Sequence, residues 1–123
     1  MTPHFRKEEL FCRCGCGMLP ARDFMEKVES LRIRYGLAMP VTSAARCPIY
    51  NATVSKTGAA GPHTTGRAID IGVRGLSAWL LMRLAFQEGF TGIGVNQKGD
   101  GRFIHIDDLP NAEGQPRPTT WSY

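Results

Sequence analysis

Hydrophobic positions recur at helical spacing in two segments of the chain. In the first, apolar residues return every three or four positions between Phe24 and Tyr35, and Gly36 follows as a stop signal. We expect Asp23 to cap the start of this helix, with Glu26 three residues later as its capping-box partner. The second segment begins near Ser77 and ends at Gly89. The pattern therefore predicts two amphipathic helices.

Short apolar runs between and after these segments are typical of strands. We expect four strands, at residues 40–43, 68–73, 92–96 and 102–107. The glycine-rich link from Gln97 to Gly101 predicts a hairpin between the last two strands. Strands that follow a leading helix, with a second helix inserted among them, indicate an α+β fold with a small central antiparallel sheet and helices packed on it.

Composition fits one soluble domain over residues 1–123, which closes with a proline-rich tail from Pro110 to Pro118. The hydrophobic fraction is 42% and the charged fraction 21%, as in ordinary globular proteins. The net charge of +4 comes without a dense Lys/Arg block or a nucleic-acid-binding motif, so we expect no nucleic-acid partner. No apolar stretch is long enough to span a bilayer, and we expect a monomer.

Three histidines occur in the chain, and two of them lie in segments that could hold a metal. His63 lies in a loop rich in Gly, Pro and Thr that leads into a strand carrying Asp70, and His105 lies in a later strand. Two nitrogens and one carboxylate oxygen suit Zn²⁺ and leave one coordination position open, as a catalytic site requires. The alternative is two unrelated histidines and an aspartate that makes local hydrogen bonds.

Four ordered blocks extend this pattern over most of the chain. They are Ser43–Asn51, Pro62–Ile71, Gly92–Val95 with Phe103–Asp107, and Arg117–Trp121. In order and spacing the blocks resemble the zinc D-Ala-D-Ala carboxypeptidases and related murein peptidases, which share a fold with the Hedgehog signalling domain. The resemblance implies that His63, Asp70 and His105 bind zinc. It also implies that Arg46 holds a substrate carbonyl or carboxylate, a role suited to a permanently charged guanidinium.

The general base is less clearly marked. Many members of the resembling family carry an acid three residues before the last zinc histidine, where this chain has Arg102. Asp107 shares a strand face with His105, since side chains alternate along a strand. Asp107 is therefore the expected catalytic base, and the alternative is a carboxylate that orients His105 through a hydrogen bond.

The resemblance implies a zinc-dependent peptidoglycan peptidase, a carboxypeptidase or an endopeptidase, that cleaves a stem or cross-link peptide bond involving D-amino acids. The alternative, which Arg102 favours, is a non-catalytic zinc-containing module that binds the cell wall or a protein. The first residues lack the apolar core of a secretory signal. We therefore expect synthesis in the cytoplasm and action on the cell wall, with release of the kind used by phage lysis enzymes.

The cysteines and the large aromatic residues form two further groups with more than one possible role. The four cysteines, Cys12, Cys14, Cys16 and Cys47, could form a second zinc site or up to two disulfides, or could stay free thiols. Four aromatic residues could line a peptide cleft: Tyr50, Trp79, Phe103 and Trp121. We expect core packing instead for all of them except Trp121, which is placed near the substrate.

Overall fold

The computed structural model describes the whole chain, residues 1–123. Its elements follow the order α1 (Lys7–Leu10), α2 (Arg22–Tyr35), β1 (Val41–Ser43), α3 (Pro48–Val54), the 3₁₀ helix η1 (Pro62–Thr65), β2 (Ala68–Ile71), α4 (Gly75–Gln87), β3 (Gly92–Asn96), β4 (Phe103–Asp107) and β5 (Thr119–Ser122). The fold is α+β, as the sequence predicts.

The five strands form one sheet in the order β1-β2-β4-β3-β5. The β1·β2, β2·β4 and β4·β3 pairs are antiparallel, and β3 and β4 are joined by the expected hairpin. However, β5 pairs in parallel with β3, so the sheet is mixed rather than wholly antiparallel. This strand was not predicted, because the long loop that precedes it brings the end of the chain back to the far edge of β3.

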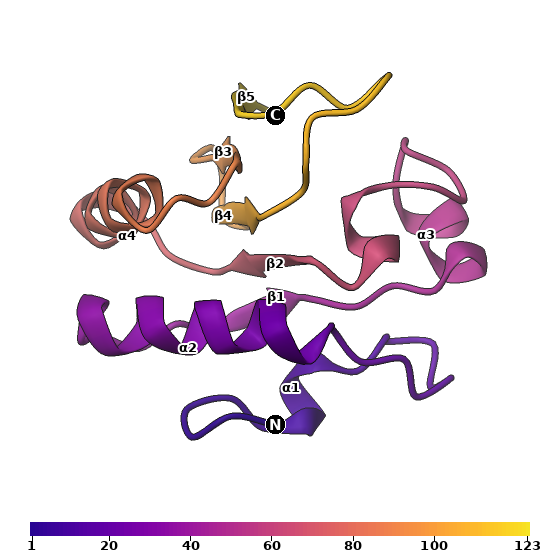
Figure 1. Cartoon of the computed structure of the whole chain (residues 1–123), viewed down its shortest axis with the longest axis horizontal. Helices are drawn as coiled ribbons and strands as arrows, with labels where there is room; N and C mark the ends of the chain where they lie inside the picture. The colour runs from indigo at the N-terminus through magenta and orange to yellow at the C-terminus, as the bar shows by residue number, and fades with distance from the viewer.

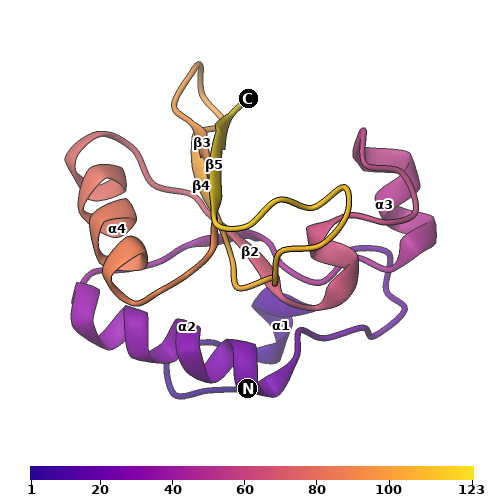
Figure 2. The same ribbon diagram turned by 45° about the horizontal axis from the view of Figure 1, so that its top comes forward.

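Helices α2 and α4 lie on one flank of the sheet, and α3 lies toward the opposite side (Figures 1 and 2). The core between α2, α4 and the sheet is built from the apolar stripe of each helix and the isoleucines of β2, β3 and β4. Burial of this apolar surface is the main force that holds the helices on the sheet. None of the helices is both long and apolar enough to cross a membrane.

The predicted start of the first long helix is wrong by two residues. The helix begins at Arg22, and Ala21, not Asp23, is its N-cap. The carboxylate of Asp23 accepts two hydrogen bonds of 2.9 Å from the guanidinium of Arg67, so it serves a tertiary ion pair instead of the helix end. The predicted end is confirmed, because Gly36 adopts the left-handed conformation with a φ of 72°.

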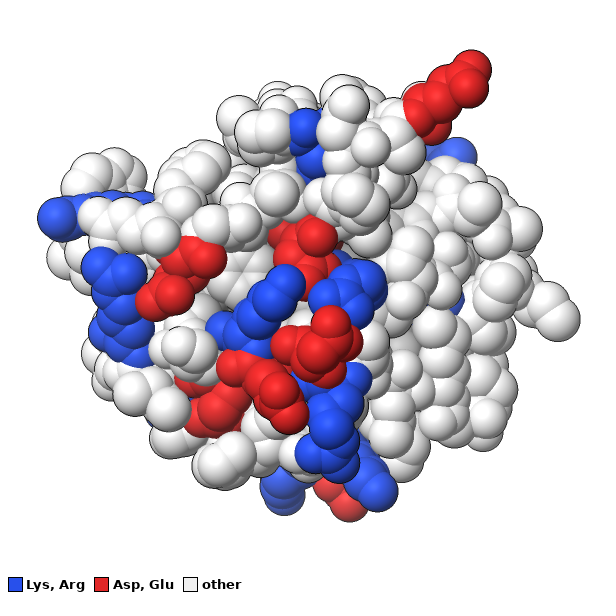
Figure 3. Space-filling view, viewed as in Figure 1, with Lys and Arg blue, Asp and Glu red and all other residues white.

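Charged side chains are distributed unevenly over the surface. On the face in Figure 3, acidic and basic residues intermingle over and around α2, whereas the part toward α3 carries few charges. Part of this charged cluster is an ion-pair network in which Asp108 accepts hydrogen bonds from Lys27 and Arg67, each at 2.8 Å. The positive net charge therefore does not gather into a basic patch on this face, as a polyanion-binding surface would require.

Candidate metal centre

The register of the sheet places Asp70, His105, Gly94 and Trp121 in one row across four neighbouring strands. Asp70 of β2 pairs with His105 of β4, His105 pairs with Gly94 of β3, and Gly94 pairs with Trp121 of β5. The residues on either side of Asp70 and His105 are isoleucines of the core. Because side chains alternate along a strand, Asp70 and His105 project from the opposite face of the sheet.

His63 reaches the same point from η1. Its Nε2 lies 3.2 Å from Oδ1 of Asp70, and Nδ1 of His105 lies 3.0 Å from the same oxygen. The opposite ring nitrogen of His63 donates a hydrogen bond of 2.7 Å to the carbonyl of Ala44, which fixes the ring orientation. One ligand atom from each of the three side chains lies within 4.8 Å of the other two. The structure therefore brings together the three predicted ligands.

Asp70 is buried and nevertheless held in its ionised form. Burial by itself raises the pKa of its carboxyl group, but the hydrogen bonds from His105 and His63, and the charges of these rings, bring the pKa well below its usual range. The site therefore offers a buried carboxylate between two imidazoles. A cation that replaced the shared protons would satisfy all three groups.

Asp107 lies on the far side of the His105 ring from Asp70. It accepts a hydrogen bond of 2.8 Å from Nε2 of His105. Arg117 donates two more, from Nε at 2.9 Å and from Nη2 at 2.8 Å. Burial raises the pKa of Asp107, but the hydrogen bonds from His105 and Arg117 and their charges lower it to about 2. The Asp107 side chain is 0% exposed. It contacts the ring nitrogen of His105 that points away from Asp70.

Arg46 lies beside the three ligands. Its Nη2 is 3.6 Å from Oδ2 of Asp70, and its guanidinium donates hydrogen bonds to Ser43 at 3.0 Å and to Asn51 at 3.2 Å. The backbone N–H of Arg46 donates to the carbonyl of His63. These contacts hold the guanidinium in one orientation with part of it still accessible, as its 17% exposed side chain shows.

The three ligands and Arg46 line a cleft of about 1150 Å³. One wall is formed by residues between Val54 and Thr65, and the other by the segment from Gly114 to Tyr123. Asp70 is the one acidic residue that lines the cleft, and Asp107 does not line it. The cleft is large enough for several residues of a peptide, because ligand sites for small molecules begin at about 300 Å³.

Trp121 and Phe103 both line the cleft, and Trp121 packs on His105 with a distance of 5.0 Å between ring centroids. Trp121 thus lies on the cleft beside a proposed metal ligand, and its contact with a substrate stays a prediction. The prediction for Trp79 is wrong, since this side chain on α4 is 59% exposed rather than part of the core. Phe103 was also expected in the core, but it packs instead against Tyr123 beside the cleft.

A match over most of the chain supports the metal site. The family model described as peptidase M15 matches residues 3–107, which include all three ligands. The chain belongs to the peptidase M15 family. Peptidases of the M15 family are zinc enzymes, and membership therefore indicates a metallopeptidase. No curated protein matches the chain.

The donor set of this M15 chain fits zinc. Two imidazole nitrogens and one carboxylate oxygen are the ligands that catalytic zinc sites commonly use. The opposite nitrogens of His63 and His105 are held by Ala44 and Asp107, as expected for histidines that bind a metal. His63, Asp70 and His105 would hold the ion.

Several residues that complete the site were not predicted from the sequence. Arg117 supports Asp107, Asn51 supports Arg46, and Gly92 and Gly94 leave room on the site face of β3. A Cβ at Gly92 would overlap the carboxylate of Asp107, and one at Gly94 would lie 2.7 Å from the indole of Trp121. The signal that could have found the glycines is their alternation in Gly92–Val95, where both fall on one strand face.

Replacing Gly94 by alanine should destabilise the fold. We expect the free energy of unfolding to fall by about 1–3 kcal/mol, because the added methyl group forces Trp121 and β5 away from β3. Urea denaturation of the purified variant measures this loss. Gly101→Ala is the matched control, since a Cβ at Gly101 meets no atom within 4 Å. Equal stability of the two variants would contradict the close packing of Trp121 on β3.

Proposed function

We propose that the chain is a zinc-dependent peptidase of peptidoglycan that cleaves a stem or cross-link peptide bond involving D-amino acids. The observation that carries the proposal is the convergence of His63, Asp70 and His105 on one point of a peptide-sized cleft. Membership of the M15 family supports the peptidase activity. Peptidoglycan as the substrate rests on the sequence resemblance and on the charge of the cleft.

The cleft is suited to a peptide that carries carboxylates. Its lining contains three basic side chains, Arg46, Lys56 and Arg117, and one acidic side chain, Asp70. Arg117 is paired to Asp107. The cations that can still meet a ligand are therefore Arg46, whose side chain is partly exposed beside Asp70, and the exposed Lys56. Stem peptides of peptidoglycan carry side-chain and terminal carboxylates, which a guanidinium can bind through two parallel hydrogen bonds.

A bound zinc would supply polarisation of the scissile carbonyl and a lowered pKa for a neighbouring water molecule. The guanidinium of Arg46 is fixed by Ser43 and Asn51 at the edge of the site, where it can stabilise negative charge that develops on the carbonyl oxygen. The indole of Trp121 covers one side of His105 and limits the access of bulk water to that ring.

For Asp107 we propose the orienting role rather than that of the base. Its carboxylate is fully buried, does not line the cleft, and already accepts hydrogen bonds from His105 and Arg117. A base must come within hydrogen-bond reach of the water it activates. The position of Asp107 behind the ring favours instead a carboxylate that holds His105 with Nδ1 directed toward Asp70.

Asp107→Asn should weaken zinc binding and activity together. We expect zinc affinity and kcat/KM each to fall by about 10–100-fold, as for other carboxylates that orient a metal-binding histidine. Zinc titration and peptide hydrolysis of the same preparation test this, with Asp100→Asn in the exposed hairpin turn as the control. Complete loss of turnover with zinc affinity unchanged would contradict the orienting role and assign the base to Asp107.

The substrate is tested by digestion of purified peptidoglycan with the zinc-loaded protein. Mass spectrometry of the products should show a new peptide terminus at a bond involving a D-amino acid, and the released fragment distinguishes a carboxypeptidase from an endopeptidase. Identical products from His105→Ala would point to a contaminating hydrolase. Intact peptidoglycan alongside cleavage of unrelated peptides would contradict the proposed substrate.

One observation favours a second candidate, the non-catalytic zinc module. The cleft has no carboxylate besides Asp70, and the position of the acid found in many members of the resembling family is Arg102. This candidate predicts that the zinc-loaded protein binds peptidoglycan in a pull-down and releases no amino groups. The role of a phage-type lysis enzyme stays a prediction from the resemblance.

A further inference from the structure

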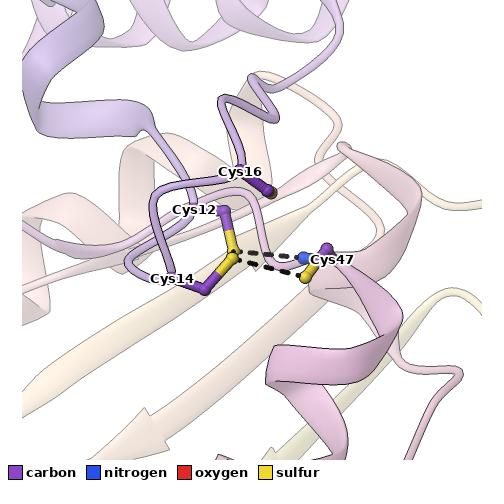
Figure 4. Close-up of side chains that lie close together, drawn as sticks. All are labelled: Cys12, Cys14, Cys16 and Cys47. Carbon is purple, nitrogen blue, oxygen red and sulfur yellow. Dashed lines mark hydrogen bonds between the residues drawn. The ribbon is translucent and has the colours of Figure 1, made fainter.

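The four cysteines gather at one place outside the cleft. Cys12, Cys14 and Cys16 lie in the loop after α1, and Cys47 is the N-cap of α3 (Figure 4). One sulfur atom from each lies within 4.8 Å of the other three. Figure 4 shows the sulfur atoms of Cys12, Cys14 and Cys47 close together between the loop and the helix. Two segments more than thirty residues apart are thus joined at this cluster.

The spacing of the sulfur atoms fits a tetrahedral metal site. Sγ of Cys14 lies 3.4 Å from Sγ of Cys12 and 3.6 Å from Sγ of Cys47. Four sulfur atoms about 2.3 Å from a zinc ion lie about 3.8 Å from one another. The atoms of a disulfide are about 2.05 Å apart, and all four cysteines are free thiols here. The cluster is therefore close to the dimensions of a Cys₄ zinc site.

Backbone N–H groups already point at these sulfur atoms. The N–H of Cys47 donates to Sγ of Cys12 at 3.3 Å, and the N–H of Tyr50 donates to Sγ of Cys47 at 3.4 Å. Such hydrogen bonds stabilise the thiolate form that binds metals. The loop itself turns back at Gly15 and Gly17, whose φ angles of 85° and 87° favour glycine. These turns allow three cysteines at alternate positions to face one centre.

The segments that the cluster joins have little hydrophobic anchoring of their own. Helix α3 has seven residues, and Asn51, a polar residue, is its one buried member. In the loop from Phe11 to Gly17 only Cys12 is buried, and no residue of this loop or of α3 packs in the hydrophobic cluster between α2, α4 and the sheet. A helix of this length is not stable in isolation. A metal that ties the loop to α3 would supply the missing constraint.

We propose that Cys12, Cys14, Cys16 and Cys47 bind a second zinc ion, which has a structural role. Each thiol releases its proton to the solvent when its sulfur donates an electron pair to the metal, and no group changes oxidation state. The ion holds the start of α3 against the N-terminal loop. Cys47 directly follows Arg46, which lines the cleft, so this metal also supports the backbone that carries the guanidinium.

Metal analysis of the protein purified under reducing conditions tests the second site. We expect about two zinc ions per chain in the unaltered protein and about one in a variant with both Cys14→Ser and Cys47→Ser. Arg13→Ser is the matched control, because this exposed residue lies in the same loop between two of the cysteines. An unchanged zinc content in the cysteine variant would overturn the proposal.

Cobalt substitution keeps the test valid even where the cysteine variant does not fold. In His63→Ala, which lacks a ligand of the other site, bound Co²⁺ should still give the thiolate-to-cobalt charge-transfer absorption. Thiol reagents should react with the cysteines of this metal-bound variant at least about tenfold more slowly than after the metal is removed by a chelator. Absence of this absorption, or a disulfide among these cysteines in the reduced, zinc-loaded protein, would overturn the proposal. Because His63→Ala lacks the catalytic site, the result is independent of peptidase activity.

Discussion

His63→Ala should lower kcat/KM for peptide hydrolysis by at least about a thousandfold. The metal in a site of this kind contributes several kcal/mol to stabilisation of the transition state, and each 1.4 kcal/mol is worth about a factor of ten. Without His63 two of the three proposed ligands remain, Asp70 and His105. His63 lies in the short helix η1 rather than in the sheet, so its replacement removes no side chain from a strand. Steady-state kinetics and metal analysis of one preparation measure the effect.

His4→Ala is the matched control for this substitution. His4 is the one histidine of the chain that is not a proposed ligand, and it pairs with Glu29, away from the cleft. We expect its replacement to leave kcat/KM and zinc content unchanged. If His63→Ala kept its zinc content and most of its activity, His63 would not be a ligand, and the assignment of the metal centre would be wrong.

Arg46→Ala should lower kcat by about 10²–10³-fold while zinc stays bound. Loss of one preorganised donor to a developing oxyanion typically costs this much. Arg46 is held by Ser43 and Asn51 next to Asp70 but is not one of the metal ligands. Arg46→Ala should therefore lose activity and keep its zinc, whereas His63→Ala should lose both.

Arg102→Ala provides the control for loss of a positive charge near the site. Arg102 precedes β4 and donates a hydrogen bond of 2.9 Å to the carbonyl of Gly99, and it does not line the cleft. We expect less than a twofold change in kcat, as is common for a surface substitution. Equal losses in the two variants would show that general electrostatics, rather than a placed guanidinium, accounts for the effect of Arg46.

Local patterns predicted the parts of the fold that depend on nearby residues. The apolar stripe that ends at Gly36 predicted α2, and the glycine-rich link after Asn96 predicted the β3–β4 hairpin. The α+β class follows from the order of these elements. Local patterns did not predict that His63, Asp70 and His105 meet, because strand register decides which residues face one another. That prediction came from the resemblance to a known family.

Long-range contacts account for most of what the sequence could not predict. Asp23 was assigned to a helix cap because capping is local, yet Arg67 offers it a two-point ion pair from far along the chain. Strand β5 carries little local signal, and its parallel pairing with β3 depends on the preceding loop. Arg117 in that loop could not be connected with Asp107 until the loop was placed over β4.

The most direct test of the metal centre compares three samples for release of free amino groups from purified peptidoglycan: the chelated protein, the same protein after zinc is restored, and His63→Ala with zinc. We expect no release after chelation, recovery with zinc, and no recovery in His63→Ala. Activity that survives chelation, or full activity of His63→Ala with zinc, would show that His63, Asp70 and His105 do not form a catalytic metal centre.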